Sequence, residues 1–186
     1  EVSNICIMPD TLLSSNIIHD INSTENLDYV FRDAMVKNKN IEWIYFITKD
    51  NFLRVYPYVN NDVYQLNHDH RTDVFYTVAT EENNPGGNAV WTKPYFDYAG
   101  RGWIITCSQP IYDNGELQAV VCIDVTLKTL ENLLSDFKLA QSGYAFLIDN
   151  AANIIYHPNY LPPKSLQGEL LPGNLLNLGV SEKYIR

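Results

Sequence analysis

Hydrophobic residues near the start of the chain recur at helical spacing in two segments. The first stripe follows Asp10, a residue that can cap a helix, and consists of Leu13, Ile17, Ile18 and Ile21. The second follows Asn22 and Glu25, whose spacing resembles a capping box, and consists of Leu27, Val30, Phe31, Ala34 and Met35. The pattern predicts two helices, the second ending near Lys37.

From residue 41 the pattern changes to runs of branched and aromatic residues, which are typical of strands. The predicted strands are 41–48, 52–59, 89–96, 103–112 and 116–125. Lys49-Asp50-Asn51 is a predicted turn between the first two, and residues 60–88 are predicted to be irregular. Asn114-Gly115 favours a two-residue type I′ hairpin between the last two.

A helix and a further strand pair are predicted after the sheet. The helix presents one apolar face, made by Leu127, Leu130, Leu133, Leu134 and Phe137. The strand pair is 144–149 and 153–157. Helices followed by an antiparallel meander predict an α+β domain.

The hairpin at Asn114-Gly115 also predicts a register. A two-residue loop places Cys107 opposite Cys122 and Ile105 opposite Asp124. Because side chains alternate along a strand, Asp124 then shares a face with these odd-numbered residues, and Tyr95 joins that face only if it pairs with an odd-numbered residue. Opposed Cβ atoms lie about 4.5–5.5 Å apart, further than the roughly 3.8 Å of a disulfide. A bond between the two cysteines in an oxidising compartment would require local strain or a closer non-hydrogen-bonded pair, so we favour two reduced thiols.

Composition excludes several classes of protein. The chain has 186 residues, 46% hydrophobic and 12% aromatic, which is enough for a sizeable core. A formal charge of −9 argues against nucleic acid and anionic lipid as partners. No apolar run reaches the roughly 18 residues of a membrane helix, and no signal peptide is seen. Because the chain opens at Glu1 without a methionine, we expect it to be cut from a longer protein.

Enzyme and metal motifs are sparse. The sequence has no GxSxG elbow, no HExxH and no phosphate-binding glycine loop. Ser108 and His157 lack an orienting acid at a recognisable spacing. His68-Asp69-His70 has donors that suit zinc, but these three residues are consecutive and no other His or Cys is usefully spaced. We therefore predict a binding module with no catalytic residue, no cofactor and no metal site.

Several motifs in the same order resemble the sheet of a Cache domain. They are Trp91-Thr92-Lys93-Pro94-Tyr95-Phe96-Asp97, Trp103-Ile104-Ile105-Thr106, Pro110-Ile111-Tyr112-Asp113-Asn114-Gly115 and Val121-Cys122-Ile123-Asp124-Val125. Further along, Gly143 to Asp149 with Tyr156-His157-Pro158 resembles the start of a second Cache module. The resemblance therefore implies a membrane-distal module over residues 1–140 and part of a membrane-proximal one over residues 141–186. The resemblance covers residues 25–160.

The resemblance implies a double-Cache sensor. Each module would be a PAS-like antiparallel sheet flanked by helices, the second only partly present. Such domains lie outside the cell membrane, in the extracellular space or periplasm, as parts of membrane-anchored chemoreceptors, histidine kinases or diguanylate cyclases. A small-molecule ligand is the implied partner, and a second copy of the chain is a further candidate. The alternative is a structural or protein-interaction Cache module with a vestigial pocket, as in channel subunits.

Ligand-binding residues follow from the resemblance by position. Family members that bind amino acids use carboxylate and aromatic groups for the ammonium and an arginine for the carboxylate. The matching positions here are Asp124, Tyr95, the Phe75-Tyr76 pair and the more distant Arg71. Trp91 is a further candidate, although a tryptophan in a strand more often packs on the sheet. Asp124 has a simpler alternative role, because it can cap the helix beginning near Thr126.

One departure from the family pattern concerns ligand charge. Asp73 stands where the arginine usually precedes the aromatic pair, and His68 stands where a tyrosine is common. If Asp73 and Asp124 both face the pocket, a cation such as an amine should bind and a dicarboxylate should not. The alternative is that Asp73 points to solvent and Arg71 replaces the missing arginine.

Overall fold

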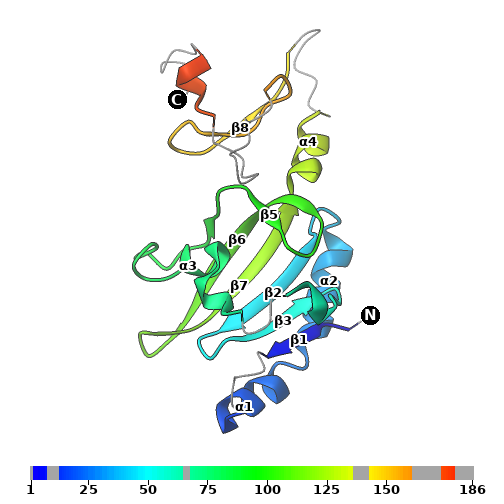
Figure 1. Ribbon diagram of the computed structural model, residues 1–186, viewed down its shortest axis with the longest axis vertical. Coiled ribbons are helices and arrows are strands. Elements are labelled where there is room, and N and C mark those ends of the chain that lie inside the picture. Colours follow the sequence, from blue (N-terminus) through cyan, green and yellow to red (C-terminus); the bar gives the residue numbers. More distant parts are fainter. Residues whose placement is uncertain (1, 8–12, 65–67, 136–142, 161–172, 179–186) are drawn as a thin grey trace.

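The structure, a computed structural model, describes residues 2–7, 13–64, 68–135, 143–160 and 173–178. Its centre is a seven-stranded antiparallel sheet in the order β1-β3-β2-β7-β6-β4, with β5 also paired to β6. Helices lie against and beyond this sheet (Figure 1). The predicted α+β class with a central antiparallel sheet is confirmed.

The strands follow the predicted pattern with two changes. They are β1 Asn4–Ile7, β2 Trp43–Thr48, β3 Phe52–Tyr56, β4 Val90–Trp91, β5 Tyr95–Asp97, β6 Gly102–Asp113 and β7 Glu116–Thr126. The edge strand β1 was not predicted, because four residues are too short for a clear alternation. The predicted strand 89–96 is divided in two, and Pro94, which cannot donate to a ladder, lies in the break.

The helices begin later than the capping patterns predict. Helix α1 is Ser15–Ser23 and its cap is Ser14, whose Oγ accepts from the Ile17 amide at 3.3 Å. Helix α2 is Leu27–Lys37 and starts after Asn26, so the predicted capping box at Asn22 is wrong, since Asn22 lies within α1. Asp10 lies outside the described residues.

The helix after the sheet is capped by a threonine. Helix α4 is Leu127–Ser135, and the Thr126 hydroxyl accepts from the Thr129 amide at 3.0 Å. Asp124 therefore does not cap it. Phe137, assigned to this helix from the sequence, lies outside the described residues. The irregular stretch before β4 contains the short helices η1 Asn61–Val63, η2 His70–Thr72 and α3 Val74–Thr77.

The β6–β7 hairpin has the predicted turn but not the predicted register. Asn114 and Gly115 both have positive φ, as a type I′ turn requires, and Asp113 pairs with Glu116. A β-bulge then leaves Gln118 as an extra residue, so every later pair shifts by one. Pro110, which has no amide hydrogen, lies next to this irregularity, where proline is tolerated.

The bulge reverses the predicted faces of β6. Ser108 lies opposite Cys122 and Thr106 opposite Asp124, so Cys107 and Cys122 are not cross-strand neighbours. The prediction that Ile105 and Cys107 share a face with Asp124 is wrong. Tyr95 pairs with the even-numbered Ile104. Because the bulge places the even-numbered residues of β6 opposite the even-numbered residues of β7, Tyr95 lies on the same face as Asp124. All three cysteines are free thiols.

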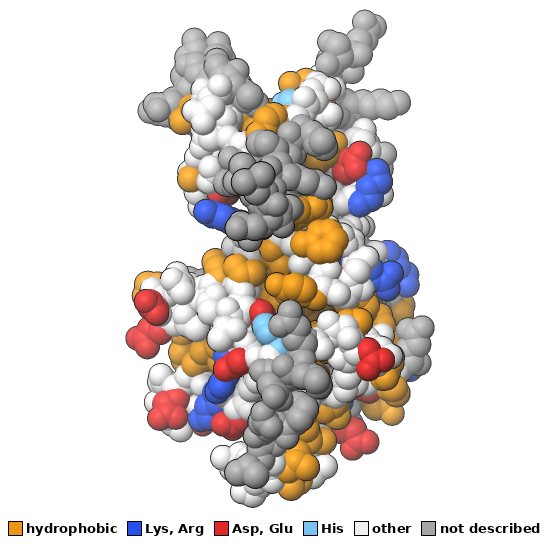
Figure 2. Space-filling model, in the orientation of Figure 1, with side chains coloured by type: hydrophobic (Ala, Val, Ile, Leu, Met, Phe, Trp, Pro, Cys, Tyr) orange, Lys and Arg blue, Asp and Glu red, His pale blue; other side chains and the backbone are white. Residues whose placement is uncertain are grey.

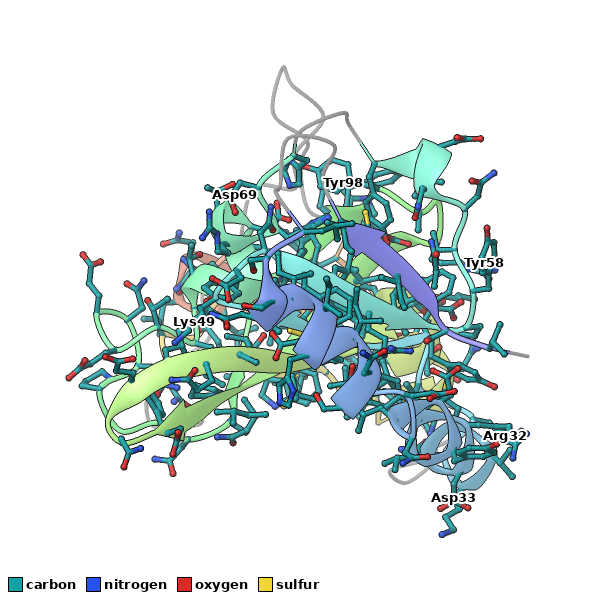
Figure 3. The ribbon with its side chains drawn as sticks, turned by 90° about the horizontal axis from the view of Figure 1, so that it is seen from below. Arg32, Asp33, Lys49, Tyr58, Asp69 and Tyr98 are labelled. Carbon is teal, nitrogen blue, oxygen red and sulfur yellow. The ribbon has the colours of Figure 1, made fainter. Side chains whose placement is uncertain are left out.

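The two faces of the sheet carry separate cores. One face packs under α1 and α2 and is almost wholly apolar; its buried residues are Phe31, Ile44, Phe46, Phe52, Tyr56 and Ala119. The other lies beneath the segment from η1 to α3; its buried residues include Trp43, Tyr45, Leu53, Val55, Val120 and Cys122. Figure 3 shows Asp69 and Tyr98 on one side of the sheet, and Arg32 and Asp33 of α2 on the other.

Beyond α4, the described residues form a small separate cluster. Strands β8 Leu147–Ile148 and β9 Ile154–Tyr156 make a hairpin, and η3 Leu175–Leu178 packs on it through Leu175, Ala152 and Ile154. Assignment of residues 141–186 to a second module stays a prediction. Over the described ranges, none of the helices has the length and apolar character needed to cross a bilayer.

Candidate functional site

A cavity of about 170 Å³ lies on the face of the sheet away from α1 and α2. Strands β2, β3, β5 and β7 and the segment from η1 to α3 supply its walls. Its lining residues are Trp43, Tyr45, Leu53, Val55, Val59, Val63, Tyr64, His68, His70, Asp73, Phe75, Tyr95, Asp97, Tyr98, Ala99 and Asp124. Cavities on the order of 150 Å³ admit a benzene-sized molecule, so this one suits a small metabolite.

Asp124 lies on β7 at this cavity and is only 3% exposed. The Tyr45 hydroxyl donates to its Oδ1 at 3.0 Å and the Thr106 hydroxyl donates to the same oxygen at 2.6 Å. Because the Thr106 proton is used there, the Tyr95 hydroxyl, 2.5 Å from Thr106 Oγ1, is the donor in that pair. Both bonds reach Oδ1, and among the described residues no donor reaches Oδ2. The second oxygen therefore remains available to a ligand.

Burial changes the ionisation of this group. Loss of solvent raises the pKa of Asp124 from its ordinary value of 3.8 to about 7. The hydrogen bonds from Thr106 and Tyr45 oppose the rise, while the nearby carboxylates of Asp97 and Glu42 add to it. Burial also raises the pKa of Tyr45 and Tyr95, so both phenols stay protonated and act as donors. No cationic side chain pairs with Asp124 among the described residues.

A second polar group lines the cavity around η2. Asp73 lies between two imidazoles: His68 Nε2 is 2.9 Å from both carboxylate oxygens, and His70 Nδ1 is 3.2 Å from Oδ2. His70 is 2% exposed and Asp73 is 12% exposed in its side chain. The Nε2 atom of His70 is buried and finds no hydrogen-bond partner in the described part of the chain.

The remaining walls are aromatic and acidic. Phe75 packs edge-on against Tyr45 at 5.4 Å between ring centroids and lies 6.1 Å from the Tyr95 ring. Asp97 accepts from the Trp43 indole at 3.3 Å. On the face seen in Figure 2, histidine and acidic side chains adjoin a band of hydrophobic ones. Among the described lining residues there is no lysine or arginine.

The structure brings together four of the residues assigned from the sequence. Asp124, Tyr95, Phe75 and Asp73 line the cavity, and the condition that both acids face it is met. Whether they contact a ligand stays a prediction.

Three other assigned residues do not line it. Tyr76 is buried in the core beside the cavity. Arg71 is exposed and donates to Asp69 and to the Lys49 carbonyl. This pairing raises the pKa of Arg71 and lowers the pKa of Asp69. Trp91 is 52% exposed on β4. The alternative in which Arg71 replaces the missing arginine is not supported.

Several residues of the site were missed from the sequence, and one of them, Thr106, contacts Asp124 without lining the cavity. Tyr45 and Thr106 read as ordinary strand residues, although a buried tyrosine hydroxyl does require a partner. His70 was considered only together with His68 and Asp69, whereas Asp69 caps η2 and pairs with Arg71. The 3₁₀ turn brings the i and i+3 positions, His70 and Asp73, onto one side instead.

Comparisons with known proteins identify the family of the chain. A family model described as methyl-accepting chemotaxis protein-like, first PDC sensor domain, matches residues 11–132, which is 122 of the 186 residues. The chain belongs to this family, and the resemblance to Cache sensors is confirmed.

Individual relatives match parts of the chain. Methyl-accepting chemotaxis protein McpC of Bacillus subtilis is 33% identical over 38% of this chain and 11% of its own length. The voltage-dependent calcium channel subunit alpha-2/delta-2 of Homo sapiens is 30% identical over 39% of this chain and 7% of its own. The ligand-binding domain of Pseudomonas fluorescens chemoreceptor CtaA, solved with L-valine, is 25% identical with a TM-score of 0.55, covering 67% of this chain and 53% of that one. The chain is homologous to chemoreceptor sensor domains and spans only a small part of the curated relatives.

Proposed function

We propose that the chain is the ligand-sensing part of a membrane-anchored receptor, placed outside the membrane, and that its ligand is a small molecule with a protonated amine. An amine or a small amino acid fits this description. The observation that carries the proposal is the buried Asp124 carboxylate, which lines the cavity without a cationic partner among the described residues. We extend the proposal to residues 141–186 as part of a membrane-proximal module.

The charge of the cavity supports a cationic group. Asp73, Asp97 and Asp124 line it together with six aromatic rings, and the described lining contains no lysine or arginine. An ammonium group held by a carboxylate and an aromatic face gains about 0.5–2 kcal/mol from the ring alone. A dianionic ligand would meet three carboxylates and no fixed positive side chain.

The relatives support a small ligand of this kind. CtaA is described as a chemoreceptor in complex with L-valine, an amino acid whose size suits a cavity of about 170 Å³. This chain lacks a pocket-lining arginine among the described residues. An amino acid's carboxylate therefore has no guanidinium partner here, and a simple amine is expected to bind at least as well.

Calorimetric titration in buffer with EDTA tests the proposal. Butylamine and L-valine are the positive probes and succinate is the negative one. Asp124→Asn should weaken amine binding by about 100-fold, because one partner of a buried charge pair is lost. Asp113→Asn, an exposed acid at the hairpin, is the matched control and should bind like the unmodified chain. Tight succinate binding that is undiminished in Asp124→Asn would contradict the proposal.

A second candidate function is an interaction module whose pocket is unused. The observation in its favour is the similarity to the calcium channel subunit alpha-2/delta-2. Thermal-shift measurements separate the two functions, since a ligand at 100 times its dissociation constant stabilises by about 2.7 kcal/mol. No shift with any amine, amino acid or carboxylate would favour the interaction module.

A further inference from the structure

The cluster of His68, His70 and Asp73 is arranged more closely than its sequence spacing suggests. One donor atom from each of these three side chains lies within 4.8 Å of the others. In a tetrahedral zinc site the bonds are about 2.0–2.2 Å, so neighbouring ligand atoms lie roughly 3.3 Å apart. Asp73 Oδ2 lies 2.9 Å from His68 Nε2 and 3.2 Å from His70 Nδ1, and both separations are close to that value.

Neighbouring elements hold the cluster in place. Asn51, at a positive φ of 60° in the β2–β3 turn, accepts from the His70 amide at 3.0 Å through its side-chain oxygen. Its side-chain nitrogen donates to the His68 carbonyl at 3.3 Å. The His70 ring also packs edge-on against Tyr64, with 5.1 Å between centroids. The two histidines are therefore fixed from β2–β3 and from η1, and do not depend on their own loop alone.

His70 presents its Nδ1 atom to the cluster, since this nitrogen lies 3.2 Å from Asp73 Oδ2. Nδ1 is therefore the nitrogen placed to bind an ion. The other ring nitrogen, Nε2, is buried and has no hydrogen-bond partner among the described residues, and an ion at Nδ1 would leave it so.

We propose that His68, His70 and Asp73 form a binding site for a zinc-class divalent cation at the wall of the cavity. Two imidazoles and one carboxylate are ligands that zinc prefers, whereas Mg²⁺ and Ca²⁺ select oxygen-rich sites. Three protein ligands leave a fourth position for water or a ligand atom, and all three residues line the cavity. The formal charge of −9 and the acidic lining favour a cation.

Such an ion would also supply the positive charge that no described lining side chain provides. In the proposed sensing role, Asp124 takes the ammonium group of a ligand. The metal uses other side chains, so the two proposals stand on different residues. A ligand with both an ammonium group and a carboxylate is the kind that would gain from the metal.

Metal titration of the chain without any organic ligand tests the site independently of the sensing role. Zn²⁺ is titrated by calorimetry, and Co²⁺ by the visible absorption of its tetrahedral complexes. We expect saturable one-to-one binding that EDTA reverses and that excess Mg²⁺ and Ca²⁺ do not displace. In the presence of Zn²⁺, the thermal midpoint of the chain should rise.

Variants assign the binding to this cluster. His68 is 28% exposed in its side chain, so His68→Gln should fold, and circular dichroism in EDTA checks this. Loss of a direct ligand should weaken Zn²⁺ binding by at least the roughly 10–100-fold typical of losing an outer partner. Asp73→Asn should do the same. His19→Gln, an exposed histidine on α1, and Cys107→Ser, a half-buried thiol, are matched controls and should leave binding unchanged.

Two outcomes would overturn the proposal. One is the absence of saturable Zn²⁺ or Co²⁺ binding by the unmodified chain, which would make the cluster a hydrogen-bonded support for the loop. The other is equal binding by the unmodified chain and by folded His68→Gln. Neither outcome bears on amine binding, which is measured in EDTA.

Discussion

The two faces of the central sheet handle a buried charge in different ways. On the face under α1 and α2, Arg54 is 4% exposed and donates to Asp28, to Ser3 and to the Ile21 carbonyl. On the cavity face, Asp124 is 3% exposed and receives two neutral hydroxyls but no cation among the described residues. One charge is neutralised within the protein, and the other is not.

This difference separates a structural role from a binding role. Arg54 joins the sheet to both helices, and its ion pair with Asp28 is complete before any ligand arrives. Asp124 is held in place by its hydroxyl donors while its charge remains unpaired, so it destabilises the domain when ionised. A buried charge without an internal partner is the kind of group that a ligand is expected to neutralise.

The largest expected effect is a loss of stability when Arg54 is replaced on the face under α1 and α2. Arg54→Met keeps most of the side-chain length but leaves Asp28 and the Ile21 carbonyl without their partner. Breaking a buried ion pair costs about 3–5 kcal/mol. Because Asp28 is partly exposed, we expect the free energy of unfolding to fall by about 3 kcal/mol, the lower end of that range. Denaturant unfolding measures it.

The matched control for Arg54 is an exposed ion pair. Lys37→Met removes an i,i+4 partner of Asp33, and both side chains are more than half exposed. Its expected cost is below about 0.5 kcal/mol. Equal losses in Arg54→Met and Lys37→Met would mean that Arg54 does not join the helices to the sheet.

The next largest effect is a gain of stability, expected when Asp124 on the cavity face is replaced. The pKa of Asp124 rises from 3.8 to about 7 on folding, so the native state binds its proton more tightly than the unfolded chain. That contribution to stability is complete below pH 3.8 and is lost as the pH rises to 7. The amide introduced by Asp124→Asn carries no charge, so the variant should gain stability relative to the unmodified chain as pH increases.

The expected gain is about 2–3 kcal/mol more at pH 8 than at pH 5. Denaturant unfolding of both proteins at the two pH values measures the difference. Asp113→Asn, which removes an exposed acid at the hairpin, is the control for the loss of one negative charge. If Asp124→Asn and the unmodified chain differ by the same free energy of unfolding at both pH values, folding does not raise the pKa of Asp124.

Much of the fold could be predicted from the sequence, because periodicity reports burial directly. The alternation in 103–112 and 116–125 identifies β6 and β7, and Asn114-Gly115 identifies their turn. The bulge at Gln118 has no comparable local signal. Since one extra residue reverses every later side chain, the face of Cys107 was predicted wrongly from a correct turn.

The candidate site was predictable only in part, for a related reason. Asp124 and Tyr95 were assigned because they match ligand-contact positions in the Cache resemblance, and Asp124 is also an acid within an otherwise apolar strand. Tyr45 and Thr106 lie far from each other in the chain and meet only through the pairing of β2, β7 and β6. Their hydrogen bonds to Asp124 depend on that register, which local pattern does not specify.

The pH dependence of binding is the third effect. An ammonium ligand pairs with ionised Asp124, so below about pH 7 a proton must leave before the ligand binds. Affinity for butylamine should fall by about tenfold per pH unit below that point and level off above it. Calorimetry between about pH 5 and 8 measures the profile, with His68→Gln as the control for the imidazoles of the same cavity. A flat profile, or one that is abolished in His68→Gln, would remove Asp124 from the role of anchor.

The smallest expected effect is a loss of amine affinity when the Tyr45 hydroxyl is removed. Tyr45→Phe keeps the ring that packs against Phe75 and removes one of the two donors to Asp124 Oδ1. The carboxylate then loses a bond that favours its ionised form, so a smaller fraction is ready to pair with an amine. Amine affinity should fall by about fivefold, the equivalent of about 1 kcal/mol for one hydrogen bond. Tyr76→Phe is the matched control, because Tyr76 lies in the adjoining core and does not line the cavity, so its affinity should match that of the unmodified chain. If Tyr76→Phe weakens amine binding as much as Tyr45→Phe does, then the ligand does not depend specifically on the hydrogen bond from Tyr45 to Asp124. Asp124 would then not be the ligand anchor that distinguishes the cavity face from the face under α1 and α2.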